Sequence, residues 1–339
     1  MKINKFKRLG CFLLMAVMMT LLAACTAAPK QTADTADNTS GTKTYKVAIV
    51  QHIDHPSLNQ IRETIKSEFK ELGLDGKVEI IEKNANGDAS MLPSIMQSLA
   101  AENVDMIIPI ATPTAQAAAA ATSTIAIVFS AVSNPIEAGL VTSFEDTSKN
   151  ITGVSNSIPI EEIFKLAAQL TPNVKTFGFV YNPSEVNSAT GIERAKAYCD
   201  ANGLKYKEAT VGSTADIQQA SASLANEVDA FFTPNDNMVA SAMPTYLQVA
   251  TNAKKPIYVG ADSMVADGGL ATVGIDYVKL GKQTAQMAQR IINGASIKDT
   301  HVEAIQEFAK MINTNTSKEL GIEIPESIKA EFEEVNSLD

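Results

Sequence analysis

The side chains of this chain that could do chemistry are small hydroxyl, amide and carboxylate groups that follow short apolar segments. Such groups suit a small polar solute better than a macromolecule, because they hold it by a few hydrogen bonds and charge contacts. In an open parallel sheet, ligands collect beyond the carboxyl ends of the strands, beside helix N-termini. The segments expected at those positions are 51–57, 112–114, 130–133, 182–185, 235–237 and 260–262.

Two of these segments suggest partners for opposite charges. Thr112 and Thr114 flank a proline that opens an alanine-rich helical pattern, where free N–H groups and hydroxyls would suit a carboxylate. The alternative is that either threonine caps this helix, a contribution of ~1 kcal/mol. Asp236 and Asp262 each end a strand pattern and could pair with an ammonium group or cap the helix that follows. From the residues alone, both roles stay open.

Arginine usage limits how a carboxylate could be held. After Arg8 the chain has only Arg62, Arg194 and Arg290, each within a helical pattern and expected on a solvated face. We therefore expect no bidentate guanidinium clamp, and backbone amides with hydroxyls would have to hold the carboxylate.

Signals for metal binding and catalysis are weak. His52 and His55 form an H-x-x-H pattern, but the third histidine, His301, is remote and loop spacing does not bring both rings to one face. The sequence lacks a nucleophile elbow, a phosphate-binding glycine-rich loop and an H-E-x-x-H motif. We therefore predict no metal site, no catalytic residue, no cofactor and no enzymatic activity. Cys199, in a helical pattern, is expected to be a buried apolar side chain.

The elements that must position these groups alternate between strand and helix. Their patterns predict strands at 45–50, 77–83, 105–110, 125–130, 174–182, 205–211, 230–235, 256–262 and 270–275. Helices are predicted at 58–73, 91–103, 112–123, 185–202, 214–226 and 277–294, and a further helix is predicted to end at about residue 253. Nearly continuous apolar strands between helices indicate parallel sheets covered on both faces. The restart after 150–158 predicts an α/β protein with two doubly wound domains.

Composition agrees with two domains. The chain has 339 residues, of which 45% are hydrophobic, and this length suits two domains of roughly 150 residues. Its formal net charge of -10 offers no basic surface for a phosphate backbone, so nucleic-acid binding is not expected.

The N-terminus indicates secretion. Basic residues up to Arg8, an apolar run over 9–22, and Ala23 and Ala24 form the pattern of a signal peptide. The tetrad that ends at Cys25 resembles a bacterial lipobox, in which the cysteine is lipidated and becomes the new N-terminus. An uncleaved anchor is the alternative, because the apolar run continues to residue 28. We predict a signal peptide over 1–24, a lipidated Cys25, a flexible tether to residue 44, and an extracytoplasmic protein anchored to the cell membrane.

Five segments together resemble a known family. They are HPSLNQIRETIKSEFKELG, DMIIPIATPTAQAAA, IVFSAVSNPIEAGLV, FGFVYNPSEVNS and INTNTSKELGIEIP. In this order they resemble signature segments of the substrate-binding lipoproteins of ABC transporters, which include tryptophan-binding members. The resemblance runs from about Tyr45 to Ile328.

The resemblance implies the type I periplasmic-binding-protein fold. In this fold two Rossmann-like lobes are joined by three hinge crossings, here near 154–158, 273–276 and 300–304. Helix 277–294 would then belong to lobe 1. The resemblance places 45–156 and 275–302 in lobe 1, and 157–274 and 303–335 in lobe 2.

The resemblance also implies a binding site between the lobes. From lobe 1 the solute would be faced by Thr112, Thr114, Ser130 and Ala131. From lobe 2 it would be faced by Asn182, Ser184, Glu185, Asn235, Asp236 and Asp262. Gln51, at the first strand end, and Tyr181, as part of an apolar wall with Phe129 and Phe232, complete the set, although aromatic strand residues such as these three are more often core than pocket. The ammonium is expected on a lobe 2 acid, Asp236 first.

The function implied is that of a monomeric receptor for an amino acid, tryptophan or another aromatic or aliphatic one. It would deliver this ligand to an ABC permease driven by a cytoplasmic ATPase. The alternatives are a binding lipoprotein for a nucleoside or another small solute, a sensor or adhesin module without transport, and an enzyme on the same scaffold. Sugars are disfavoured, because they often stack on tryptophan and this chain has none.

Overall fold

The computed structural model describes residues 44–145, 149–305 and 307–336. The predicted signal peptide over 1–24, the predicted lipidation of Cys25 and nearly all of the predicted tether lie outside these residues. In the part of the chain that is described, no helix combines the length and hydropathy needed to cross a membrane.

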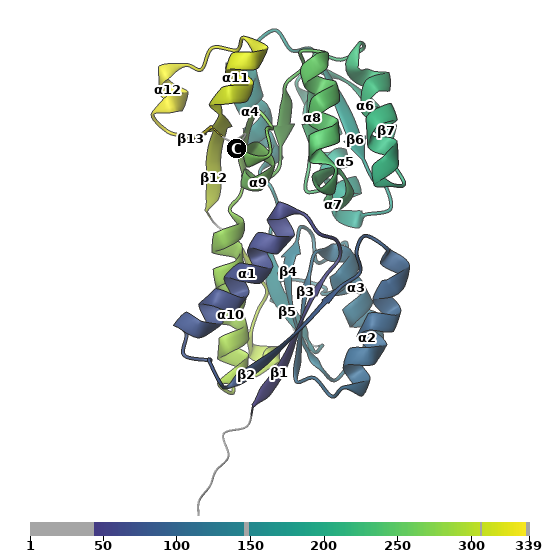
Figure 1. Cartoon of the computed structure of the whole chain (residues 1–339), viewed down its shortest axis with the longest axis vertical. Helices are drawn as coiled ribbons and strands as arrows, with labels where there is room; N and C mark the ends of the chain where they lie inside the picture. The colour runs from purple at the N-terminus through teal and green to yellow at the C-terminus, as the bar shows by residue number, and fades with distance from the viewer. Residues whose placement is uncertain (1–43, 146–148, 306, 337–339) are drawn as a thin grey trace, which may run out of the picture. The chain divides into compact units, whose positions relative to one another are not determined.

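Strand and helix alternate along the chain and build two sheets (Figure 1). Over the described residues, one sheet has six strands in the order β11-β5-β4-β3-β1-β2, and the other has seven in the order β13-β12-β10-β9-β8-β6-β7. Neighbouring strands pair in parallel except β10 and β12, which are antiparallel. The expectation of an α/β fold with two doubly wound sheets is confirmed.

The first sheet carries the elements of the N-terminal half together with two later elements. Its strands are β1 (Tyr45–Gln51), β2 (Val78–Asn84), β3 (Met106–Ile110), β4 (Ala126–Val132), β5 (Ile151–Ser155) and β11 (Glu303–Ala304). Its helices are α1 (Pro56–Glu71), α2 (Leu92–Ala101), α3 (Thr112–Ala121) and α10 (Tyr277–Ile292). Strand β11 pairs with β5, so this sheet continues two residues beyond 302, the predicted end of lobe 1.

The second sheet holds most of the remaining elements. Its strands are β6 (Thr176–Tyr181), β7 (Lys205–Thr210), β8 (Ala230–Thr233), β9 (Ile257–Val259), β10 (Ala271–Ile275), β12 (Phe308–Asn313) and β13 (Glu333–Val335). The helices of this half are α4 (Ile160–Leu170), α5 (Val186–Ala201), α6 (Ile217–Ala225), α7 (Asn237–Ser241), α8 (Met243–Asn252), α9 (Asp262–Ala266), α11 (Thr314–Leu320) and α12 (Glu326–Lys329).

Burial follows the position of each strand in its sheet. The central strands β3 and β5 are buried at every residue, whereas the edge strands β2 and β7 are partly exposed. Central strands are covered by helices on both faces, which explains their nearly continuous apolar sequences.

Helix α10 packs against α1, and both helices lie beside the first sheet (Figure 1). The two backbones approach closely at Gly281, where a Cβ would lie 2.8 Å from the Cβ of Thr64 and 3.1 Å from the carbonyl oxygen of Ile61. Glycine at this position therefore sets the distance between two helices that both begin near the pocket described below.

We expect Gly281→Ala to lower the free energy of unfolding by about 1–2 kcal/mol. Alanine usually stabilises a helix interior by about 0.5–1 kcal/mol relative to glycine, but overpacking costs about 1–3 kcal/mol and should prevail here. Denaturant unfolding measures the difference. Gly212→Ala, in a loop, is the control for a Gly→Ala change without close contacts, because the nearest neighbouring atom would lie 3.9 Å from the added Cβ. A Gly281→Ala protein as stable as the wild type would contradict the close approach.

Candidate functional site

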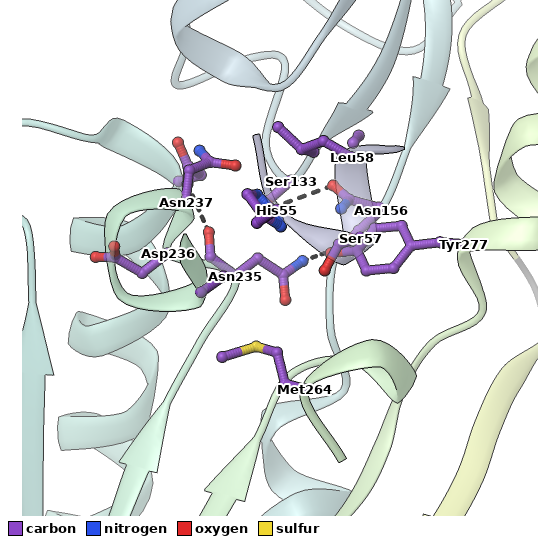
Figure 2. Close-up of a pocket in the computed structure, with 13 residues that line it drawn as sticks. His55, Ser57, Leu58, Ser133, Asn156, Asn235, Asp236, Asn237, Met264 and Tyr277 are labelled. Carbon is purple, nitrogen blue, oxygen red and sulfur yellow. Dashed lines mark hydrogen bonds between the residues drawn. The ribbon is translucent and has the colours of Figure 1, made fainter. Parts of the chain in front are cut away.

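A pocket lies where loops of the two halves meet. In Figure 2 the lining side chains converge from several loops and helix starts. The lining residues are His55, Ser57, Leu58, Ala131, Ser133, Asn156, Asn187, Asn235, Asp236, Asn237, Ala240, Met264 and Tyr277. None of these thirteen is lysine or arginine, so the described lining offers no cationic side chain at neutral pH.

The fold brings these residues together because parallel strands end at the same edge of a sheet and are each followed by a helix. Helix α1 begins at Pro56. Its N-cap residue, His55, has an extended backbone, and the side chain of His55 does not cap the helix. Helix α10 begins at Tyr277 after Asp276, whose side chain accepts from the N–H of Lys279 at 2.9 Å. The positive ends of two long helices therefore lie at the pocket, where they favour a negative group.

Both histidines of the first loop are buried and uncharged at neutral pH. Burial lowers the pKa of His55 to about 4, which outweighs the opposing effect of the nearby Asn237 side chain. Burial also lowers the pKa of His52, against the charge of Asp236. A neutral imidazole has one donor and one acceptor nitrogen, and neither ring nitrogen of His55 has a hydrogen-bond partner in the described structure.

Asp236 is a structural carboxylate at the edge of the pocket. It is the N-cap of α7, with Oδ1 accepting from the N–H of Val239 at 2.8 Å. Its Oδ2 accepts from the N–H of Asn182 at 2.7 Å and from the hydroxyl of Ser188 at 2.6 Å. Burial, together with the nearby charge of Glu185, raises the pKa of Asp236 to about 7.

Glu185 lies behind the pocket and holds two of its asparagines. Its carboxylate accepts from Asn187 Nδ2 at 3.1 Å, from Asn237 Nδ2 at 2.5 Å, and from the N–H groups of Asn237 and Met238 at 3.2 and 3.3 Å. The side chain is almost fully buried, and this burial raises the pKa of Glu185. Glu185 therefore orders the pocket wall without lining it.

Tyr277 forms part of the opposite wall. Its ring is buried, and burial together with the charge of Asp262 raises the pKa of its hydroxyl well above the usual range. Side-chain hydrogen bonds with Ser57 and Asn156 act in the opposite direction. Tyr277 is thus a neutral phenol that packs beside the loop of α1.

Polar contacts join the two halves around the pocket. The hydroxyls of Ser57 in α1 and Ser263 in α9 are 2.5 Å apart. Asn235 donates through Nδ2 to the carbonyl of Asn156 at 3.3 Å. At the surface, Thr190 donates to Glu137 at 2.5 Å. These contacts involve residues of both halves, so a change in how the halves are placed would break or form them.

The structure places three of the predicted site residues, Ala131, Asn235 and Asp236, in the pocket lining. Ser130 instead points to helix α10, where its hydroxyl is 2.8 Å from that of Thr284. Tyr181 donates to Glu208 at 2.9 Å. These two side chains therefore have structural partners away from the lining.

The remaining residues predicted from the second half lie around the pocket. Asn182 accepts from the N–H of Ser184 at 2.9 Å, and Ser184 itself is exposed. Asp262 is the first residue of α9 and accepts from the N–H of Ser263 at 2.6 Å. Burial raises the pKa of Asp262 to about 6.

Thr112 and Thr114 occupy the first turn of α3 but do not line the pocket. The N-cap of α3 is Ala111, at φ 77°, and no side chain caps this helix. Both threonine hydroxyls are buried without a partner in the described structure. Capping by either threonine, the alternative considered from the sequence, is therefore not observed.

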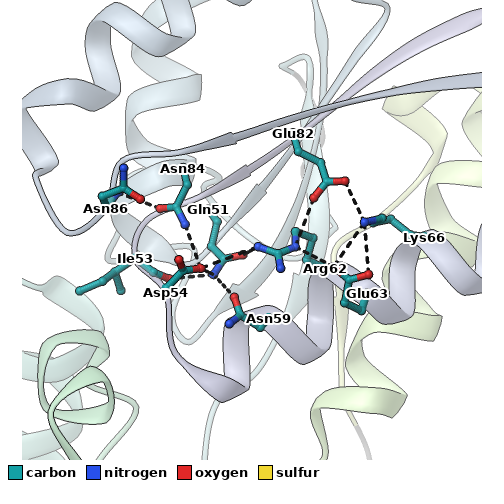
Figure 3. A network of polar contacts seen from close by, with 10 residues as sticks. All are labelled: Gln51, Ile53, Asp54, Asn59, Arg62, Glu63, Lys66, Glu82, Asn84 and Asn86. Atoms are coloured by element: carbon teal, nitrogen blue, oxygen red, sulfur yellow. Dashed lines mark hydrogen bonds and ion pairs between the residues drawn. The ribbon is translucent and has the colours of Figure 1, made fainter.

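Gln51 anchors the loop that carries His52 and His55 (Figure 3). Its amide nitrogen donates to the carbonyl of Ile53 at 2.8 Å and to Asn59 Oδ1 at 2.6 Å. Its oxygen accepts from Arg62 Nη1 at 2.9 Å. Arg62 also pairs with Glu82 at 3.3 Å, so the first loop is tied to α1 and β2.

Several lining residues were not among the predicted contacts. Five of them lie at strand ends or in the predicted boundary segment, where a sequence signal exists: His55, Ser57, Ser133, Asn156 and Asn237. Leu58, Asn187, Ala240, Met264 and Tyr277 lie within helices, and their contribution depends on which helices meet at the pocket. Among the residues described, no group of three or more His, Cys, Asp or Glu is placed to hold a metal ion.

Comparison with known proteins gives consistent matches over this region. A family model described as ABC transporter substrate binding protein matches residues 46–336. A tyrosine-binding protein of Clostridioides difficile is 34% identical over 287 residues, which cover 84% of this chain and 83% of that protein.

Two solved structures allow a comparison of three-dimensional arrangement. The ABC domain of Streptococcus pneumonia in complex with L-Trp has a TM-score of 0.83 at 38% identity, covering 86% of this chain and 99% of that one. A ligand-free, open substrate binding protein with adhesive properties from Clostridium difficile has a TM-score of 0.67 at 34% identity, covering 87% of this chain and all of that one (100%).

Proposed function

The chain belongs to the ABC transporter substrate binding protein family. We propose that it binds an amino acid, and specifically an aromatic one, in the pocket described above. It would then deliver this amino acid to a permease. The observation that carries this proposal is the pocket itself, which is lined from both halves by polar and apolar side chains.

The lining supports an aromatic amino acid. Leu58, Met264 and Tyr277 supply apolar surface, and the asparagines and His55 supply hydrogen-bonding groups. Phe129 and Phe232, considered as walls from the sequence, are fully buried in the cores and absent from the lining. The L-Trp complex and the tyrosine-binding protein, both more than 30% identical to this chain, support the same ligand class.

Binding would act by closing two lobes around the solute. We take the lobes as 45–156 with 275–302 and 157–274 with 303–335, except that β11 (Glu303–Ala304) belongs to the sheet of the first lobe. A solute that contacts both lobes stabilises the closed arrangement by its higher affinity for that arrangement. The TM-score to the L-Trp complex is higher than the TM-score to the ligand-free open protein. This difference supports an arrangement of the two halves close to the ligand-bound one.

The rest of the proposal concerns the cell surface. An importer's binding protein works outside the cytoplasm, and the N-terminal pattern supports secretion, lipidation of Cys25 and a tether over 25–44. The protein would act as a monomer, pass its ligand unchanged to the permease and depend on a cytoplasmic ATPase through that permease. No step of this cycle requires a bond to be made or broken by this chain.

Tryptophan fluorescence tests the proposal directly, because the chain contains no tryptophan. The emission of L-tryptophan should shift to the blue and saturate as the purified protein is added, since the indole leaves water for an apolar pocket. L-Tyrosine, L-phenylalanine and L-leucine should displace it in order of their affinity. Adenosine and glucose serve as negative controls. An unchanged spectrum at saturating protein, with no thermal stabilisation by any of the four amino acids, would overturn the proposed function.

A further inference from the structure

The carboxamide of Asn187 has one orientation that satisfies its surroundings. Its Nδ2 donates to Glu185 at 3.1 Å and to the backbone carbonyl of Asn235 at 2.7 Å, which uses both amide hydrogens. The flipped amide would face a carboxylate and a carbonyl with its own oxygen, which is repulsive. The oxygen Oδ1 is therefore oriented by two acceptors on the other side of the group.

This oxygen is a buried acceptor without a protein partner. Asn187 is 6% exposed, lines the pocket, and its Oδ1 makes no hydrogen bond in the described structure. Asp236 lines the same side of the pocket, and the carboxylate of Glu185 lies directly behind. A buried acceptor beside two carboxyl groups suits a donor that carries positive charge.

The start of helix α1 presents donors to the same pocket. Helix α1 has 16 residues and no side-chain cap, and Pro56 has no N–H, so the first-turn N–H groups of Ser57 and Leu58 remain for a ligand. Ser57 and Leu58 both line the pocket. His55, 6% exposed, lines it as well, with neither ring nitrogen bonded in the described structure. These groups and the positive end of the helix suit a carboxylate.

We propose that the pocket binds a zwitterion in one direction, with the carboxylate on His55 and the first turn of α1, and the ammonium on Asn187 Oδ1 beside Asp236. This inference rests on the proposed function and makes it more specific. It moves the carboxylate from the α3 threonines expected from the sequence to α1. It also assigns the direct ammonium contact to a carboxamide, with Glu185 as the residue that positions it. A nucleoside or a sugar lacks both charges and would leave these groups unpaired.

Two ligand analogues and two variants test the direction. Tryptamine lacks the carboxylate of L-tryptophan, and indole-3-propionate lacks its ammonium. We expect Asn187→Ala to weaken L-tryptophan and tryptamine by about tenfold or more, and indole-3-propionate by less than about twofold. We expect His55→Leu to weaken L-tryptophan and indole-3-propionate to a similar extent and to spare tryptamine. Competition against L-tryptophan fluorescence gives all affinities, including weak ones.

The outcomes separate this inference from the function on which it rests. If the wild-type protein binds none of the four amino acids tested above, the proposed function itself fails. If it binds L-tryptophan but each variant weakens all three ligands equally, or the crossed pattern is reversed, the direction of binding is wrong. Thermal unfolding shows whether each variant folds. Asn187→Ser and His55→Gln are milder changes that should give the same crossed pattern if a larger change prevents folding.

Glu185→Gln tests the positioning role. Glutamine keeps the size of the side chain but replaces one acceptor oxygen by a donor that faces the donors of Asn187 and Asn237. The preference for L-tryptophan over indole-3-propionate should therefore decrease towards that of Asn187→Ala. A merely structural defect would weaken both ligands by one factor and leave this preference unchanged.

Discussion

Asp236→Ala is expected to lower the free energy of unfolding by about 4 kcal/mol in the absence of any ligand. The substitution leaves the N–H groups of Asn182 and Val239 and the hydroxyl of Ser188 without their acceptor inside the protein. Each of these hydrogen bonds contributes about 0.5–1.5 kcal/mol when the carboxyl group is neutral and about 1.5–3 kcal/mol when it is charged. Relief of the repulsion between Asp236 and Glu185 offsets part of the loss. Denaturant unfolding at neutral pH measures the difference.

Asp276→Ala is the matched control for this substitution. Asp276 is also an N-cap, but it makes one such hydrogen bond, to Lys279 at 2.9 Å, near the surface. Loss of a single exposed cap costs about 1 kcal/mol. Equal effects of the two substitutions would contradict the role of Asp236 as the junction between three segments. In that case Asp236 would be free to serve mainly as a ligand group.

His55→Gln is expected to remove much of the loss of stability that acid causes in the wild-type protein. Burial holds the pKa of His55 at about 4, below its ordinary value of 6.5. Between pH 6.5 and 4 the unfolded chain therefore binds a proton that the folded protein does not. The free energy of unfolding falls as the pH falls through this window, by about 3 kcal/mol for this group. The stability is fully present above pH 6.5.

The measurement is denaturant unfolding of the wild type and the variant from pH 7 to pH 4. The difference in stability between them should move by about 3 kcal/mol in favour of the variant over this range. Asp236 acts in the opposite direction, because its raised pKa makes the folded protein bind the extra proton between about pH 4 and 7. This contribution is present in both proteins and cancels in the difference. Parallel profiles for His55→Gln and the wild type would show that His55 is not buried as described.

The effects expected for Asp236→Ala and for His55→Gln have a common cause, which is the poor solvation of the pocket. His52, His55, Asp236 and Glu185 are all nearly inaccessible to water, and burial favours the neutral form of each. A zwitterion would bring its own two charges into this environment. Helix ends, amides and carboxyl groups that are already ordered can then solvate those charges without first being reorganised.

Much of the secondary structure could be predicted from local patterns. Strands β1, β3 and β4 were predicted to within a few residues, because each is short, apolar and bounded by turn residues. Helix α10 was predicted from its apolar spacing and the glycine that follows it. Strand β5 was predicted only as a boundary, because its residues, with Gly153 in the middle, carry no alternating pattern. Its burial on both faces is a property of the sheet.

The antiparallel pairing of β12 with β10 also could not be predicted from local patterns. The two strands are far apart in the sequence, and nothing in either segment specifies the direction of its neighbour. The direction follows from where the chain re-enters the second sheet after β11.

For the site, the residue types at the strand ends predicted a cluster of small polar groups beside helix N-termini. Ala131, Asn235 and Asp236 line the pocket, and the residues around them belong to the same loops. The roles of individual side chains were not predictable. Whether Gln51 faces a solute or Arg62 depends on the position of α1, and whether Ser130 faces a solute or Thr284 depends on α10.

The amino-acid sequence by itself determined the class of fold, the alternation of elements and the family, because local hydrophobic periodicity and short segments carry that information. The tertiary structure decided which helix starts meet, and so placed Asn187, Met264 and Tyr277 around one pocket with His55. It also decided that Asp236 and Glu185 hold backbone and amide groups. The physical reason is that burial and hydrogen-bond geometry, which set the charge and direction of each group, arise only when segments distant in sequence pack together.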